Sequence, residues 1–163
     1  MDSIITIEPI DEQNFGDIAV LITYDKVLLK SLSPGRDFQT AINELKTMDD
    51  IFKKEFEYIT KWQTDNDANS YAIRLKNKSI GLISLSHQKG RQANVGYWLA
   101  SSEWNKGYAT KAFDQIINIA KKRGFTKLLA TIDSSNIASK RIWENRGASF
   151  DIRDNKLITS LKI

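Results

Sequence analysis

Two segments of this 163-residue chain carry residue types that could bind and act on an anionic ligand. The first is Trp104–Thr110, with the sequence WNKGYAT, which we expect to lie between a strand and a helix. Backbone N–H groups at a helix start have no partner inside the helix, and the helix dipole adds partial positive charge there. A glycine such as Gly107 lets the backbone come close to a phosphate. The segment therefore predicts a phosphate site, although a plain helix start after a turn would show the same pattern.

The second segment is Asn136–Gly147, with the sequence NIASKRIWENRG. On a helix, one face carries Asn136, Ser139, Lys140 and Trp143, so it presents an amide, a hydroxyl, an ammonium and an indole. These groups could hold a polar ligand. The alternative interpretation is an N-cap asparagine, a solvated polar face and Trp143 in the core.

Cysteine and histidine, two residue types that serve as catalytic groups and metal ligands, are nearly absent from the chain. The chain has no cysteine, which excludes a disulfide scaffold, a cysteine zinc site and a cysteine nucleophile. With one histidine, His87, we expect no histidine-rich metal site. An imidazole titrates in the range that suits a general base, although His87 also fits a surface residue at a turn. No Asp or Glu lies between Ile80 and Ser102.

Composition is typical of one globular domain, with 41% hydrophobic and 27% charged residues. No apolar run has the form of a signal peptide or the length of a membrane span, so we expect a cytoplasmic protein. The net charge of +4 fits an anionic ligand but is also common in small soluble proteins. Because the basic residues are scattered among acidic ones, we expect no nucleic acid as partner. Because no apolar run is long enough to span a bilayer, we also expect no membrane partner.

The elements that must position these groups follow from periodicity and from Gly, Pro and Asn breaks. Before Asn69 we expect one strand and then helices: Ile4–Ile7, Asp17–Leu32 ended by Ser33–Gly35, and Phe38–Trp62 with a break near Met48–Asp50. From Ser70 onward we expect strands at Tyr71–Leu75, Ile80–Leu85, Ala93–Ala100, Leu128–Ile132, Ala148–Arg153 and Leu157–Ile163, with helices over Gly107–Arg123 and from about Asn136 to Arg146. Gly96 within its strand suggests a bulge or a close backbone approach. The order predicts an α/β fold with a mixed, mostly antiparallel sheet, one β-α-β unit and helices on both faces.

Together the two segments resemble the GNAT superfamily of N-acetyltransferases, in its RimJ/RimL-like branch. VGYWLASSEWNKGYATKAFDQII is similar to that branch's bulged strand, pyrophosphate loop and first helix, and NIASKRIWENRGASF is similar to its later motif. Gly107 and Ala109 match the family's loop pattern, whereas Trp104 replaces its leading Arg or Gln. The resemblance covers about Ser70 to Phe150 and implies a single GNAT domain over residues 1–163, with 1–69 on the acceptor side and 70–163 as the acyl-CoA-binding core.

The resemblance also implies acetyl-CoA as donor, no metal, a primary amine as acceptor (a protein N-terminal α-amine or a small molecule), and a monomer or homodimer. Backbone groups of Trp98, Leu99 and Ala100 would pair with the pantetheine arm. The pyrophosphate would be held by Asn105, Lys106, Gly107, Tyr108, Ala109 and Thr110. Asn136 would bond the pantetheine amide, Ser139 and Trp143 would lie near the thioester, and Lys140 or Lys106 could meet the adenosine phosphates.

Direct attack by an amine on the thioester requires a neutral amine, a donor for the developing oxyanion and a thiolate that leaves. Many relatives have a tyrosine acid where this chain has Trp143, and an indole N–H is no useful acid. Ser139 stands where RimL-like relatives use a serine for this role, and His87 is the remaining candidate base. A non-catalytic GNAT-fold protein that binds coenzyme A and regulates is the alternative interpretation.

Overall fold

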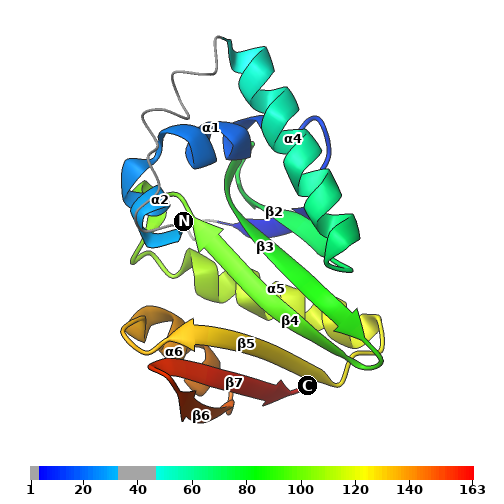
Figure 1. Cartoon of the computed structure of the whole chain (residues 1–163), viewed down its shortest axis with the longest axis vertical. Helices are drawn as coiled ribbons and strands as arrows, with labels where there is room; N and C mark the ends of the chain where they lie inside the picture. Colours follow the sequence, from blue (N-terminus) through cyan, green and yellow to red (C-terminus); the bar gives the residue numbers. More distant parts are fainter. Residues whose placement is uncertain (1–3, 33–46) are drawn as a thin grey trace.

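The strands of the described residues, 4–32 and 47–163 of this computed structural model, pair into one seven-stranded sheet of order β1-β2-β3-β4-β5-β7-β6 (Figure 1). They are Ile5–Pro9 (β1), Asn69–Leu75 (β2), Lys78–Lys89 (β3), Gln92–Leu99 (β4), Lys127–Asp133 (β5), Ser149–Arg153 (β6) and Lys156–Lys162 (β7). Only β4 and β5 are parallel neighbours, and helix α5 (Tyr108–Lys122) joins them. The predicted mixed sheet with one β-α-β unit is confirmed.

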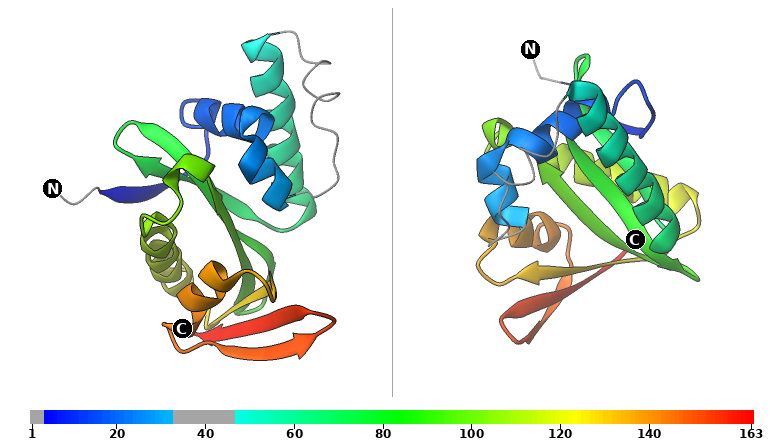
Figure 2. Two further views of the ribbon diagram at one scale, coloured as in Figure 1. Left: turned by 90° about the vertical axis from the view of Figure 1, so that its left-hand side faces the viewer. Right: turned by 45° about the horizontal axis from the view of Figure 1, so that its top comes forward.

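Helices cover both faces of this sheet (Figure 2). On one face lie α1 (Gly16–Tyr24), α2 (Lys26–Leu32) and α4 (Met48–Asp65), and on the other lie α5 and α6 (Ile137–Glu144). A short 3-10 turn, η1 (Ser101–Glu103), leads from β4 towards α5. Within the described part of the chain, no helix has both the length and the apolar character to cross a membrane.

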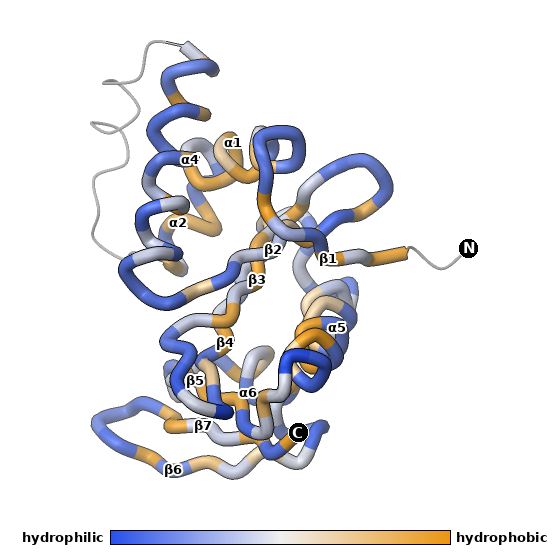
Figure 3. The backbone as a smooth tube through the Cα atoms, turned by 90° about the vertical axis from the view of Figure 1, so that its right-hand side faces the viewer, coloured by the Kyte–Doolittle hydropathy of each residue, from blue (hydrophilic) through white to orange (hydrophobic). Residues whose placement is uncertain are grey.

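Two clusters of buried side chains hold the layers together. Under α5, Phe113 and Ile116 are fully buried against the sheet, as the periodic stripe of that helix predicts. On the opposite face, Phe15 and Ile18 of α1 pack with Ile51 of α4. Hydrophobic residues in Figure 3 accordingly follow the central strands and one side of α5. Each fully buried side chain of this size contributes about 1.5–3 kcal/mol.

The helices before β2 differ from the prediction at one point. Asp17–Leu32 is not a single helix, because the chain turns at Asp25, whose carboxylate accepts the N–H of Leu28 at 3.1 Å and caps α2. The break near Met48–Asp50 is confirmed as the start of α4, where the Thr47 hydroxyl accepts the Asp50 N–H at 3.1 Å. The predicted break at 33–35 and the first part of the helix predicted from residue 38 lie outside the described residues.

The irregularity expected at Gly96 lies elsewhere. Gly96 pairs with Ser84 in regular register, and no atom lies within 4 Å of the place a Cβ would take, so the predicted bulge or close approach there is wrong. The register shifts instead between Ser86 and Lys89, where His87 has φ 49°. The glycine that permits close approach is Gly81, since a Cβ there would collide with the carbonyl oxygen of Trp98.

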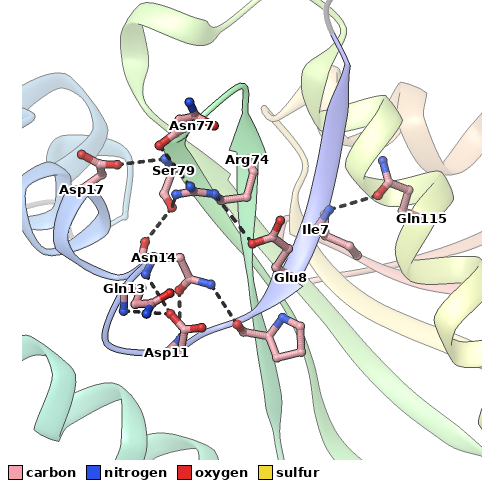
Figure 4. Close-up of polar contacts among 11 residues, drawn as sticks. Ile7, Glu8, Asp11, Gln13, Asn14, Asp17, Arg74, Asn77, Ser79 and Gln115 are labelled. Atoms are coloured by element: carbon pink, nitrogen blue, oxygen red, sulfur yellow. Dashed lines mark hydrogen bonds and ion pairs between the residues drawn. The ribbon is translucent and has the colours of Figure 1, made fainter.

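A network of polar contacts fixes α1 and α5 to the sheet (Figure 4). The loop before α1 is anchored by Asn14, whose amide donates to the Pro9 carbonyl at 2.9 Å. Asp17 accepts the N–H of Ser79 at 3.0 Å, which ties α1 to the β2–β3 hairpin. At the sheet edge, the Ile7 N–H donates to the side chain of Gln115 on α5 at 3.0 Å. The helices on both faces are therefore held in register with the strands between them.

Candidate functional site

The site is built around a gap between β4 and β5. The two strands pair only over 92–94 and 127–129 and then diverge towards their carboxyl ends, as Figure 1 shows. Beyond Asn94, no strand of the described residues pairs with the edge of β4 that faces β5. An unpaired strand edge presents backbone donors and acceptors that an extended ligand can pair with.

The direction of each backbone group on β4 follows from its ladder with β3. The Ala100 N–H donates to the Ile80 carbonyl at 2.7 Å. Because such pairs alternate in an antiparallel ladder, Trp98 and Ala100 direct their backbone groups at β3, whereas Tyr97 and Leu99 direct theirs into the gap. Of the three predicted pantetheine partners, only Leu99 therefore points into the gap, and Tyr97 joins it.

The loop after β4 has the geometry of an anion site. Asn105 and Gly107 are both left-handed, with φ 62° and 79°, and Gly107 is the N-cap of α5 without a side-chain cap. The next residues of the predicted site, Tyr108, Ala109 and Thr110, form the first turn of α5, whose N–H groups have no acceptor within the helix. The predicted pyrophosphate loop therefore presents a row of backbone donors at a helix start.

Trp104 fixes the beginning of this loop. Its indole N–H donates to the carbonyl oxygen of Leu99 at 3.0 Å, so the side chain folds back over the end of β4. A guanidinium or amide would stand here in the family's pattern, and the indole instead connects the loop to the strand edge. The two cations predicted for the adenosine phosphates already have partners: Lys106 pairs with Glu103 at 3.2 Å, and Lys140 lies 5.9 Å from the ring centre of Phe150. An ion pair at the surface such as that of Lys106 with Glu103 is weak, so this lysine can be redirected to a ligand.

A carboxylate from the opposite face anchors the same loop. Asp25 accepts both the N–H and the hydroxyl of Ser101, each at 2.7 Å, in addition to the Leu28 N–H. Partial burial raises the pKa of Asp25, but its hydrogen bonds with Ser101, Leu28 and Val27 together outweigh burial and hold the pKa below its usual value of 3.8. Asp25 therefore joins the corner between α1 and α2 to the start of the loop, a role that the sequence did not reveal.

Helix α6 supplies the remaining predicted groups. The Asn136 side chain is its N-cap and accepts the Ser139 N–H at 3.1 Å, so its amide NH2 is the part that could meet a ligand. Ser139 is half-buried and lies beside β4. Trp143 is fully buried against Phe113, with ring centres 4.8 Å apart. This placement makes Trp143 a core residue, as the alternative interpretation of this helix expected.

Tyr97 is a functional candidate that the sequence reasoning missed. Its hydroxyl lies 2.7 Å from the Ser139 hydroxyl, and its ring packs edge-on against Phe113 at 6.1 Å. Burial raises the pKa of Tyr97, while Ser139, Arg146 and Trp143 act in the opposite direction. The alternation of β4 already placed Tyr97 on the face opposite Trp98, but it did not indicate what Tyr97 would touch.

The second predicted catalytic residue, His87, is far from this cluster. It is exposed at the bulge of β3, where its backbone N–H donates to the Asn66 carbonyl at 2.7 Å and its ring Nδ1 lies 3.2 Å from the Ser86 hydroxyl. Tyr97 pairs with Ile83, four residues earlier in β3, which corresponds to about 13 Å along the strand. The structure therefore does not bring His87 and Ser139 together, and His87 fits the surface residue that was the alternative.

Comparison with known proteins concerns the family and the fold of this chain. Residues 5–149 match the family model described as an acetyltransferase (GNAT) domain. No curated protein sequence matches the chain. Solved structures with a similar fold include the ribosomal L7/L12 α-N-protein acetyltransferase RimL in complex with coenzyme A, with a TM-score of 0.74 and 16% identity over 100% of this chain and 96% of that one.

Two further structures have the same fold. RimJ of Mycobacterium smegmatis, in complex with CoA-disulfide, gives a TM-score of 0.74 at 15% identity over 98% of this chain and 82% of that one. The PaiA N-acetyltransferase of Thermoplasma acidophilum, in complex with coenzyme A, gives 0.70 at 14% identity over 98% and 99%. At these identities the likeness concerns the fold.

Proposed function

Because the chain belongs to the GNAT acetyltransferase family, we propose that it moves an acetyl group from acetyl-CoA to a primary amine by direct attack, as a RimJ/RimL-like enzyme. The observation that carries the proposal is the start of α5 beside the open edge of β4. There Gly107 has a left-handed backbone conformation, and no side chain of the N-cap accepts from the first N–H groups of the helix. A diphosphate needs several aligned N–H donors, and an extended pantetheine arm needs an unpaired strand edge. Here the two features are adjacent in the fold.

In this proposal residues 70–163 bind the donor. The loop from Asn105 to Thr110 holds the pyrophosphate, and the backbone of Leu99 and Tyr97 pairs with the arm. The amide of Asn136 meets the arm from α6. A backbone N–H on the open edge of β4 is then the donor for the oxyanion that develops at the thioester carbonyl. A preorganised donor of this kind lowers the activation free energy by about 2.7–4 kcal/mol.

The acceptor side is formed by residues 1–69, with α1, α2 and α4 over the face of the sheet that carries Trp98. No Asp or Glu lies on the chain between Ile80 and Ser102, and His87 is distant from Ser139. With no strong base from these central strands, the site favours an amine that is already partly neutral. An α-amine has a pKa of about 7.7–8.0, so on the order of a tenth is neutral at pH 7, against less than about a thousandth of a lysine amine. We therefore propose an α-amine, such as a protein N-terminus, as acceptor.

The test is release of free thiol from acetyl-CoA with a panel of amines at pH 7. We expect turnover with a peptide that has a free N-terminus, and slower turnover with spermidine. The matched control is the same peptide with a blocked N-terminus and an internal lysine. Faster acetylation of spermidine or of the blocked peptide would overturn the choice of acceptor.

The alternative, a regulatory protein that binds coenzyme A without chemistry, makes a different prediction for the same preparation. Calorimetry would then show binding of acetyl-CoA, while no amine in the panel would be acetylated. Absence of binding would contradict both functions.

A further inference from the structure

Tyr97 and Ser139 meet across the open part of the gap. Parallel pairing of β4 ends at Asn94, and three residues later the Tyr97 hydroxyl reaches the first turn of α6. The distance of 2.7 Å is that of a good O–H···O hydrogen bond. We infer that Tyr97 is a positioning residue, which holds the Ser139 hydroxyl so that the serine's own proton points at the thioester sulfur. This inference rests on the proposed acetyl transfer.

The surroundings decide which hydroxyl donates. Trp143 lies under the pair, because its ring and that of Tyr97 both pack edge-on against Phe113. An indole N–H can only donate. In this conformation the indole nitrogen is buried without a hydrogen bond, yet it acts on the Tyr97 hydroxyl as a polar neighbour. The Trp143 N–H therefore presents its positive end to the Tyr97 oxygen without forming a hydrogen bond, and on this ground we assign the Tyr97 proton to the bond with Ser139.

Burial keeps Tyr97 in this donor role. Because burial raises its pKa, the phenol stays protonated at neutral pH and does not itself supply the proton that the sulfur needs. With one lone pair of Ser139 occupied by Tyr97, the serine proton is directed outwards. Ser139 and Tyr97 are both half-buried, whereas Trp143 is fully buried, so the serine hydroxyl stays accessible to a ligand and the indole does not.

The chemistry balances without a net proton from the cluster. The amine nitrogen bonds to the carbonyl carbon, the carbon–sulfur bond breaks, and its electron pair stays on sulfur. The proton that the amine loses on becoming an amide ends on that sulfur. Ser139 donates a hydrogen bond to the sulfur while charge develops there, and Tyr97 keeps the serine in that orientation.

The experiment is a double-mutant cycle of Tyr97→Phe and Ser139→Ala, with kcat and KM for acetyl-CoA and unfolding by urea for each variant. We expect Tyr97→Phe to lower kcat about 3- to 10-fold, the effect of one hydrogen bond, with KM changed less than about twofold. In the Ser139→Ala background, Tyr97→Phe should have no further effect, because it acts through the serine. Tyr71→Phe is the control, since Tyr71 is a buried tyrosine of the same core cluster on β2, and its kcat should stay at the wild-type value.

Two kinetic results would overturn the inference: an unchanged kcat for Tyr97→Phe, or the same loss with and without Ser139. A binding measurement on the wild-type chain keeps the test independent of turnover and of how the variants fold. The wild type should bind coenzyme A more tightly than desulfo-coenzyme A above about pH 8.5, where a thiol ionises. Ser139→Ala and Tyr97→Phe should reduce this preference alike. If the wild type shows no preference, the inference fails even if amines are acetylated. If the preference is present but no amine is acetylated, only the proposed function fails.

Discussion

Two glycines at opposite ends of α5 allow a sharp test of the pyrophosphate loop. Gly107 begins the helix and Gly124 follows its end, with φ 79° and 86°. Beside both, the space for a Cβ is open. Alanine at either position therefore has no clash to relieve and carries the same cost of a left-handed conformation, about 1–2 kcal/mol. Only Gly107 lies at the donors that the pyrophosphate would meet.

The effect on affinity can be estimated from charge. A glutamate at position 107 would place a carboxylate roughly 5 Å from the pyrophosphate, where one pair of like charges repels by about 1 kcal/mol in water and about 3 kcal/mol near a protein surface. Those values correspond to a loss of affinity of about 5- to 150-fold. Gly107→Ala, which adds backbone strain without charge, should lie between the wild type and Gly107→Glu. Gly124→Ala should bind acetyl-CoA like the wild type.

The assays are calorimetric binding of acetyl-CoA and unfolding by urea on the same preparations. We expect the two alanine variants to lose similar free energy of unfolding and to differ in affinity. Unchanged affinity of Gly107→Glu would refute the loop assignment. If Gly124→Ala weakened binding as much as Gly107→Ala, the loss would come from strain in the helix rather than from a ligand contact.

Three further predictions concern residues that position the site. Asp25→Asn should lower the free energy of unfolding by about 1.5–3 kcal/mol at neutral pH. Because the pKa of Asp25 in the folded protein lies below 3.8, the charged carboxylate contributes to the free energy of unfolding above that pH, and this contribution is lost as the pH falls through the lowered pKa. The stabilities of the wild type and the variant, measured by urea unfolding, should therefore converge in acid. A difference that stays constant with pH would contradict the role of the charge. Trp104→Phe removes the hydrogen bond to Leu99 and should weaken acetyl-CoA binding about 2- to 10-fold by calorimetry, and equal affinity would show that the indole does not fix the loop. Trp143→Ala should lower the free energy of unfolding by about 3–5 kcal/mol, measured in urea. Trp143→Phe should lower it less, because phenylalanine keeps an aromatic ring in the core and removes a buried N–H that has no hydrogen bond. Equal losses for the two variants would contradict this account.

Local patterns in the sequence were enough to predict helix α5 and its two ends. The apolar stripe of α5, which includes Phe113 and Ile116, is buried as its spacing predicts. Gly107 is left-handed at the start of that helix, and Gly124 is left-handed just after its end. These features were predictable because helix periodicity and glycine's access to positive φ act over a few neighbouring residues.

The bulge was not predictable in the same way. Gly96 has the residue type that marks a bulge, but the register shift belongs to His87 in the neighbouring strand. A register depends on how two strands align with each other, and a single glycine does not specify that alignment. The break at Asp25 was missed for a related reason, because a helical period continues across it while its carboxylate turns to Ser101.

The sequence by itself therefore determined most of the elements, their order and the residue types in the loop before α5. It left Trp143 open between the ligand and the core, and it gave no sign that Tyr97 matters. Tertiary structure placed Trp143 in the core and brought Tyr97 to Ser139, because these two residues are 42 positions apart in the sequence and meet only in the fold, beyond the point where the pairing of β4 with β5 ends. The link between Asp25 and Ser101 spans 76 positions. Contacts over such separations follow from the order and register of the strands, which no local pattern contains.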